Sequence, residues 1–299
     1  MPKVKLTPEM ARDYLKSNTR NRPLRQSHII KLARDMVAKR WVYNGESIKF
    51  AKDGSLIDGQ HRLHAIIRAG VAVETEVVTD LDTASFYTID SGLRRKTADY
   101  LSLDHGIVNA FIVANAGRMI VNYLTGRRLG EGVQPSEVMA FFERDNNMKE
   151  IEELCREAKN TSKANTFIPY GTVAAVAWLG SRGHGLDKAY EFVHGLTTGL
   201  NLQEGDPRYA LRNIFLGVKS GGRTRDYQWA MACTTSAWNA FVRGQKLFRM
   251  SPRRSDTGGW KLYRIDGAPN PSDLTYLSEH DAEEPSNTEA VNDITRTGT

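Results

Sequence analysis

Five consecutive residues, Asp58-Gly59-Gln60-His61-Arg62, concentrate more polar chemistry than any other short stretch of the chain. They stand between a strand-like run and a helix-like run, and amide groups at a helix start attract anions. We therefore expect Arg62 to clamp a phosphate through paired hydrogen bonds and Gly59 to let the ligand approach closely. His61 would act as a donor or an acid. Asp58 and Gln60 would orient the ligand, and Asp58 could also help to hold a metal ion.

The same five residues also have a purely structural interpretation, which the sequence leaves open. In that interpretation Asp58 caps the helix, and Gln60 and His61 lie on the surface. Arg62 then forms an ion pair with Asp58.

Short strands and helices surround this segment. Residues 51–54 end in Asp-Gly and separate two strand-like runs, which is typical of a hairpin. Gly59 permits a sharp turn into a helix, and Gly70 is a suitable end for it. The predicted elements are, in order, a helix at 8–16 with Thr7 as its N-cap, a helix at 24–40, strands at 47–50 and 55–57, a helix from 60 to 70, and a strand at 71–78. Residues 1–92 are expected to form a small α+β domain.

Residues 24–78 resemble the ParB N-terminal domain of the ParB/sulfiredoxin superfamily. The shared features are a helix, a strand, an Asp-Gly hairpin, a second strand, and a Gly-X-X-Arg helix start followed by Ala. The ParB turn reads Gly-Glu-Arg-Arg, and the turn here reads Gly59-Gln60-His61-Arg62, close to an Asp-Gly-Gln-His-Arg variety of phage proteins. The resemblance implies that the helix start holds the phosphates of a nucleoside triphosphate, CTP or ATP, together with Mg²⁺.

The sequence departs from that family in three ways. Gln60 replaces the acid of the ParB turn, which removes a carboxylate from metal-bridged nucleotide hydrolysis. Gln60 also occupies the place of the sulfiredoxin-type cysteine, so cysteine reductase chemistry is not expected. The DNA-reading helix-turn-helix of ParB has no clear counterpart.

Glu46, just before the first strand of the hairpin, is a candidate to replace the missing carboxylate. It would do so if the strand places it across the pocket from Asp58. His61 and His64 could share a helix face, but no cysteine or third histidine lies nearby, so no zinc site is expected.

A second polar group, Asp90 with Arg94 and Arg95, follows the small domain. Phage-type ParB-like proteins often show an Asp-x-Gly followed by basic residues here, so the resemblance implies that these residues complete the nucleotide site. The alternative is an exposed basic helix start at a domain junction.

The next part of the chain, residues 93–245, is expected to be an all-helical domain. Gly221-Gly222 joins two of its helices, with Arg223 and Arg225 at the junction. These arginines would contact nucleic acid if the pair were a helix-turn-helix, whereas a helical hairpin packed on its aromatic residues is the open alternative.

Residues 246–299 are expected to be a basic linker and an acidic disordered tail. Between residues 243 and 264, seven basic residues face a single acid, and Phe248, Trp260 and Tyr263 are interleaved with them. Cations mixed with aromatic residues suit single-stranded or non-specific nucleic acid, and Arg249, Arg253 and Arg254 are the candidates. A flexible basic linker without a dedicated ligand is the alternative.

The charge of the chain is strongly asymmetric. The net charge is +6, yet residues 273–299 carry seven acids and one base, so residues 1–272 carry +12. A body this basic favours a polyanionic partner, because neutralised phosphates release counterions.

Composition narrows the class of protein. Hydrophobic residues make up 40% of the chain and charged residues 25%, but the longest apolar run, residues 173–179, is far too short to span a bilayer. The start of the chain lacks the apolar segment of a signal peptide, and two cysteines cannot form a disulfide scaffold. We expect a cytoplasmic protein, in the host cytoplasm if phage-encoded, with no membrane partner.

Together these features predict a ParB-like nucleotide-binding, DNA-associated protein of phage or mobile-element type. The expected partners are DNA and a nucleotide, and the sequence leaves a homodimer open. One alternative is a metal-dependent nuclease or phosphoryl-transfer enzyme, with Glu46, Asp58 and Asp90 as candidate carboxylates. The other is a non-enzymatic DNA-binding regulator.

Overall fold

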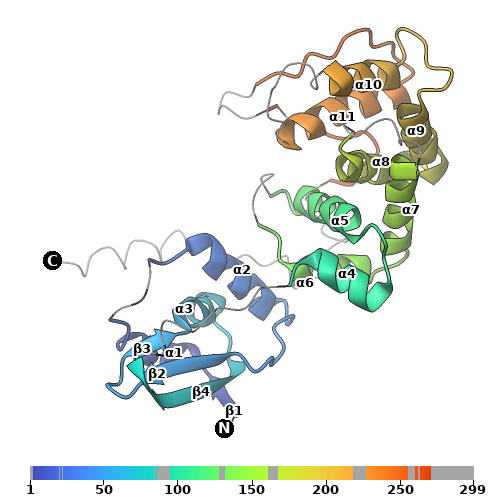
Figure 1. Cartoon of the computed structure of the whole chain (residues 1–299). Coiled ribbons are helices and arrows are strands. Elements are labelled where there is room, and N and C mark those ends of the chain that lie inside the picture. Colours follow the sequence, from blue (N-terminus) through green and yellow to red (C-terminus); the bar gives the residue numbers. More distant parts are fainter. Residues whose placement is uncertain are drawn as a thin grey trace. The chain divides into compact units, whose positions relative to one another are not determined.

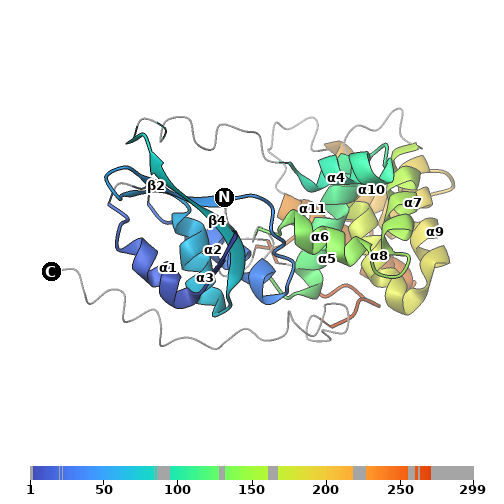
Figure 2. The same ribbon diagram turned by 90° about the horizontal axis from the view of Figure 1, so that it is seen from below.

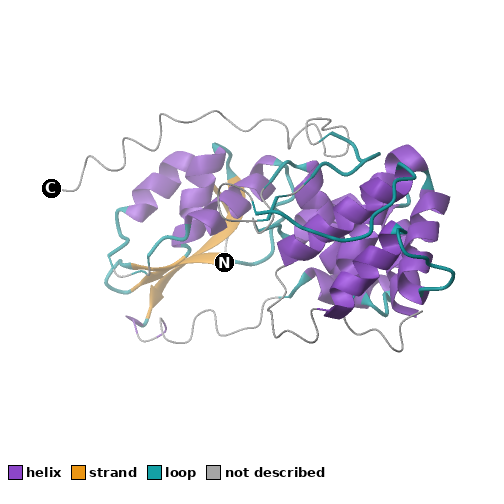
Figure 3. Ribbon diagram, turned by 90° about the horizontal axis from the view of Figure 1, so that it is seen from above, coloured by secondary structure: helices purple, strands orange, loops and turns teal. Residues whose placement is uncertain are grey.

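The computed structural model describes residues 3–19, 21, 23–83, 85, 95–127, 132–160, 168–217, 227–254, 260–261 and 263–270. Within these ranges the protein is mixed α/β, as predicted, with eleven helices and four strands. The chain divides into two compact units, residues 1–91 with 274–299 and residues 92–273. All the described strands lie in the first unit, and helices make up the second (Figure 1, Figure 3).

The four strands form one sheet in the order β1-β4-β2-β3. Their bounds are Lys3–Leu6 for β1, Ser47–Ala51 for β2, Leu56–Asp58 for β3 and Val73–Leu81 for β4. β2 and β3 are the predicted hairpin, in which the Gly54 amide donates to the Ala51 carbonyl at 2.9 Å. β1, which the sequence analysis did not predict, pairs antiparallel with β4, and β4 runs parallel to β2.

Three helices pack against this sheet (Figure 2). They are α1 (Pro8–Leu15), α2 (Gln26–Val37) and α3 (Gln60–Ala69). α1 begins as its sequence predicts, because the Thr7 hydroxyl accepts a hydrogen bond from the Met10 amide at 3.3 Å. Buried apolar residues of the sheet and the helices share one core, among them Leu6, Ile29, Ile48, Leu63 and Ile66.

The turn from β3 into α3 depends on Gly59. Its φ of +103° lies in the left-handed region, and a Cβ atom placed on it would lie 2.5 Å from the Cδ1 atom of Ile48. The close approach that the structure shows for this glycine is to β2 of the same unit, and its approach to a ligand stays a prediction. The approach to β2 lets the first turn of α3 lie directly on the sheet.

The second unit is built around α8 (Tyr170–His184), in which every residue from 172 to 181 is buried. α8 contacts α5 (Ala110–Leu124), α7 (Asn147–Asn160), α9 (Leu186–Thr198) and α11 (Tyr227–Val242). The remaining helices are α4 (Thr97–His105), α6 (Pro135–Phe142) and α10 (Pro207–Gly217). Gly180 leaves room for the indole of the fully buried Trp238, which locks α11 against α8.

Part of the expected linker packs on these helices. Ile265 and Ala268 are buried, the Trp238 indole donates to the Asp266 carbonyl at 2.9 Å, and Arg243 forms an ion pair with the Asp266 carboxylate. The packed part of the second unit thus continues beyond residue 245. The acidic stretch from 273 onward lies outside the described residues.

Two further observations concern the described residues as a whole. None of their helices combines the length and the apolar character that crossing a membrane requires. Cys155 and Cys233 are buried free thiols, and burial raises the pKa of both.

Replacing Gly59, at the start of α3, should destabilise the first unit far more than replacing Gly70, at the end of the same helix. For Gly59→Ala we expect a loss of about 2–5 kcal/mol, the sum of left-handed strain and of overpacking against Ile48. Gly70→Ala, with a φ of +67° and nothing within 4 Å of the added Cβ, should cost only about 1–2 kcal/mol of strain. Urea unfolding followed by circular dichroism measures both, and equal losses would contradict the proposed contact.

Candidate functional site

The first residues of α3 include two polar side chains that lie inside the protein. Gln60 is 4% exposed and accepts a hydrogen bond from the Asn18 side-chain amide at 3.2 Å. His61 is 6% exposed, and its Nε2 accepts the Arg25 backbone amide at 3.1 Å. An imidazole nitrogen that accepts in this way carries no proton.

These contacts give Gln60 and His61 a structural role. They join the segment between α1 and α2 to the start of α3. Asn21 reinforces the connection, since its side-chain amide donates to the Leu56 carbonyl at 2.7 Å. The structural interpretation of the sequence placed Gln60 and His61 on the surface, whereas in the structure both side chains are buried.

Arg62 lies between two carboxylates. Its Nη1 is 2.9 Å from Oε2 of Glu46, and its Nη2 is 3.0 Å from Oδ2 of Asp58. The same Asp58 oxygen also accepts from Nζ of Lys49 at 3.2 Å. We call Glu46, Lys49, Asp58 and Arg62 the charged cluster.

The backbone explains why these four side chains meet. Lys49 and Asp58 are partners in the β2–β3 register. Arg62 lies one helical turn after Asp58, and Glu46 directly precedes β2. The Arg62–Asp58 ion pair is the one that the structural interpretation expected. Glu46, the carboxylate that the functional interpretation singled out, lies on the other side of the same guanidinium.

Exposure differs sharply across the charged cluster. The side chains of Arg62 and Asp58 are 11% and 14% exposed, whereas that of Glu46 is 58% exposed. Lys49, at 28%, lies between these values, so Glu46 is the most exposed member of the charged cluster. An incoming ligand would meet the Glu46 carboxylate first.

The formal charges of the cluster balance, with two carboxylates against two cations. A lone phosphate would have to compete with Glu46 for Arg62. A phosphate that carries Mg²⁺ suits the set better, because Mg²⁺ is commonly held by one or two carboxylates together with substrate phosphates. Glu46, the exposed carboxylate, would hold the metal, and Arg62 and Lys49 would face the phosphate oxygens. No group of three or more His, Cys, Asp or Glu side chains suited to a metal occurs among the described residues.

The remaining predicted site residues lie either outside the described residues or in the second unit. Asp90, Arg94, Arg223 and Arg225 lie outside the described residues. Arg95 is exposed just before α4 and belongs to the second unit, as do the remaining arginines of the prediction, Arg249, Arg253 and Arg254.

Lys49 and the asparagines before α2 were not predicted. The hairpin pattern could have identified Lys49, since a strand residue opposite Asp58 must contact it. Asn18 and Asn21 reach the turn through contacts between distant parts of the chain, which periodicity does not reveal.

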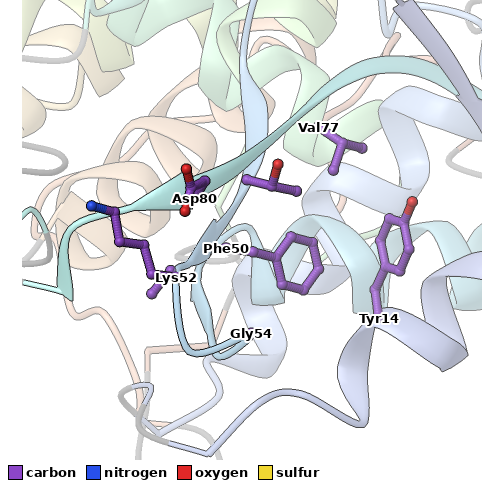
Figure 4. A pocket seen from close by; sticks show the side chains of 8 residues that line it. Tyr14, Phe50, Lys52, Gly54, Val77 and Asp80 are labelled. Atoms are coloured by element: carbon purple, nitrogen blue, oxygen red, sulfur yellow. The ribbon is translucent and has the colours of Figure 1, made fainter.

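The first unit also has a cavity, of about 430 Å³, away from the charged cluster (Figure 4). It is lined by Tyr14, Phe50, Ala51, Lys52, Gly54, Val77, Thr79 and Asp80. The rings of Tyr14 and Phe50 meet edge to face in it, with centroids 5.2 Å apart. It lies at the hairpin end of β2, whereas Glu46 lies at the other end, and no residue of the charged cluster lines it.

The two carboxylates should differ in their effect on stability. Asp58→Asn leaves the nearly buried Arg62 and the partly exposed Lys49 without their shared partner, and we expect a loss of about 1–3 kcal/mol in the free energy of unfolding. Glu46→Gln removes an exposed partner and should cost less than about 1 kcal/mol. Urea titrations of both variants measure the difference, and the reverse order would contradict the described burial.

His64 should make stability depend on pH. It is half-buried on α3, and burial lowers the pKa of its imidazole below 6.5. The unfolded chain then binds the proton more readily, so the free energy of unfolding should fall as the pH drops through 6.5. The stability difference between wild type and His64→Gln should change across this range, and a constant difference would contradict it.

Comparison with family models, with curated proteins and with solved structures gives no match for this chain. The function of the charged cluster must therefore be argued from its own residues. Those residues offer carboxylates and cations together, beside a helix start.

Proposed function

We propose that the first unit binds a nucleoside triphosphate, CTP or ATP, with Mg²⁺ at the charged cluster, and that the protein is a DNA-associated, ParB-like protein of phage type. The observation that carries the proposal is Arg62, which lies within hydrogen-bonding distance of both Glu46 and Asp58. In this hydrogen-bonded set, the Glu46 carboxylate can pair with the positive metal, and the cations can pair with the negative phosphate oxygens of a metal–nucleotide complex.

The exposure of Glu46 supports this assignment. The Glu46 carboxylate could bind Mg²⁺ in place of Arg62 while the other contacts of the charged cluster remain. This exchange would free one edge of the Arg62 guanidinium for phosphate. Asp58 would keep the other edge of the guanidinium in place. Bidentate hydrogen bonding by arginine suits phosphate oxygens in such a geometry.

The strand, turn and helix around Gly59 support the ParB-like part of the proposal. β3, the left-handed Gly59 and α3 follow one another without a gap, as in the Gly-X-X-Arg helix start of that family. The proposal assigns no phosphate contact to His61, whose Nε2 accepts a hydrogen bond from the Arg25 amide in the interior.

A second function, metal-dependent phosphoryl transfer or nuclease activity, is favoured by the exposed carboxylate of Glu46. It could hold Mg²⁺ or accept a proton at the surface, the two tasks that such chemistry requires of a carboxylate. Hydrolysis or transfer products would distinguish this function from binding alone. DNA binding unaffected by nucleotide and metal would instead favour the non-enzymatic regulator.

The association with DNA is supported by charge. Residues 1–272 carry a net +12, which attracts a polyanion and makes its binding sensitive to salt. This support does not depend on the charged cluster, whose own charges cancel.

Nucleotide binding should require Mg²⁺ and the charged cluster. We expect calorimetric titration of ATP, CTP and GTP to show binding with Mg²⁺ and none with EDTA. Glu46→Gln should weaken binding about 10- to 100-fold, because an interaction with a charged group is lost. Arg62→Ala should abolish it, and phosphate release measured in parallel tests turnover.

The matched control is Glu9→Gln, which removes an exposed carboxylate paired with Arg12 in the same unit. It should leave nucleotide affinity unchanged. If none of the three nucleotides bound folded wild-type protein in the presence of Mg²⁺, the proposal would fail. Equal weakening in Glu9→Gln and Glu46→Gln would move the site away from the charged cluster.

A further inference from the structure

The chain that follows α11 runs back over the helices of its own unit (orange to red in Figure 1). Near its start, the Leu247 amide donates to the Gly205 carbonyl at 2.8 Å, and the Phe248 ring lies against Gly205. Near its end, Ile265 is buried and its amide donates to the Tyr123 hydroxyl at 3.3 Å. We call the described residues between these anchors, 246–254, 260–261 and 263–264, the basic strip.

The two arms of the basic strip are joined to each other. Arg254 and Trp260 form an antiparallel bridge, and the Lys261 amide donates to the Arg253 carbonyl at 2.8 Å. The Arg254 guanidinium lies 4.4 Å from the centre of the Trp260 ring. Anchors at both ends and bonds across the middle give the strip a defined backbone, so less ordering remains to be done when a ligand binds.

The described residues of the basic strip carry a large excess of positive charge, although one acid, Asp256, lies between its two arms in the sequence. The strip contains six cations and no acid, namely Lys246, Arg249, Arg253, Arg254, Lys261 and Arg264, and all six are exposed. The charged cluster of the first unit, in contrast, contains as many carboxylates as cations. An unbalanced row of cations along a chain matches a polyanion with repeated charges.

Aromatic rings are interleaved with these cations. Phe248 is 65% exposed and Tyr263 is 38% exposed, with Nζ of Lys261 5.7 Å from the Tyr263 ring centre. Such rings give stacking surfaces to unpaired bases. The bases of a duplex are already stacked on one another, so exposed rings beside cations favour a single strand.

We propose that the basic strip binds a single strand of nucleic acid, with the cations along the phosphates and the rings of Phe248 and Tyr263 against the bases. This inference rests on the proposed association with DNA. It adds that the nucleic acid is single-stranded and that it binds at the basic strip. It does not require a nucleotide at the charged cluster.

The test is fluorescence anisotropy with the full chain and labelled oligonucleotides of about 20 nucleotides, longer than a typical single-strand site. Single-stranded DNA, single-stranded RNA and duplex DNA are compared between about 50 and 200 mM salt. We expect at least one single strand to bind more tightly than the duplex. Phe248→Ala and Tyr263→Ala should each weaken single-strand binding about 5- to 10-fold and leave its salt dependence unchanged.

Removal of a cation should give a different signature. Arg249→Ala and Arg253→Ala should each reduce the slope of log affinity against log salt by about 0.7, the value for one phosphate contact on a single strand. The matched controls lie on α5 of the same unit. They are Phe111→Ala, which removes a ring that is 69% exposed, and Arg118→Ala, which removes an exposed cation.

Each outcome decides between the two proposals. Duplex binding as tight as single-strand binding, with no loss in Phe248→Ala and Tyr263→Ala, would overturn this inference and leave the DNA association standing. Binding of single-stranded RNA alone would support the inference and overturn the DNA association. No binding of any oligonucleotide would overturn both proposals, whereas equal losses in the α5 controls would overturn this inference alone.

Discussion

The geometry of the first unit depends on the close approach between Gly59 and Ile48. Only a residue without a side chain can adopt a φ of +103° there and leave room for the Ile48 methyl group. The approach brings the first turn of α3 onto the sheet, and this turn ends with Arg62, four residues after Asp58. Arg62 is thereby held at the edge of β3, where Asp58 and Glu46 both reach it.

The short polar motif at this turn divides into two groups with different roles. Gly59, Gln60 and His61 face the interior. The Gln60 side chain accepts a hydrogen bond from Asn18, and the His61 side chain accepts one from the Arg25 amide. Asp58 and Arg62 face the charged cluster. Burying a polar side chain without a hydrogen-bond partner is costly, and this explains why Gln60 and His61 are each paired in the interior. A motif of five residues can thus hold a turn together and still present only two of its side chains to a ligand.

Local patterns predicted much of this fold because local contacts determine it. The Asp-Gly hairpin, the Thr7 cap of α1 and the helix between Gly59 and Gly70 each depend on residues within a few positions of one another. β1 was missed because it consists of four residues whose strand character depends on pairing with β4, some 70 residues away. The charged cluster was predicted in part, with Glu46, Asp58 and Arg62 named and Lys49 overlooked. The burial of Gln60 and His61 depends on the segment between α1 and α2, and sequence spacing carries no information about that packing.

The basic strip illustrates the same limit in the second unit. From about residue 244 onward the sequence is rich in charged residues, Gly, Pro and Ser, and that composition alone predicts a flexible chain. A few contacts change that outcome, because the indole of Trp238 and the hydroxyl of Tyr123 hold the backbone at Asp266 and Ile265. Once that end is fixed, the cations before it can no longer spread freely through solvent, and their mutual repulsion remains within a confined backbone. A strand of phosphates would relieve that repulsion, whereas the charged cluster, whose formal charges cancel, would suit the proposed ligand because a metal–nucleotide complex brings charges of both signs.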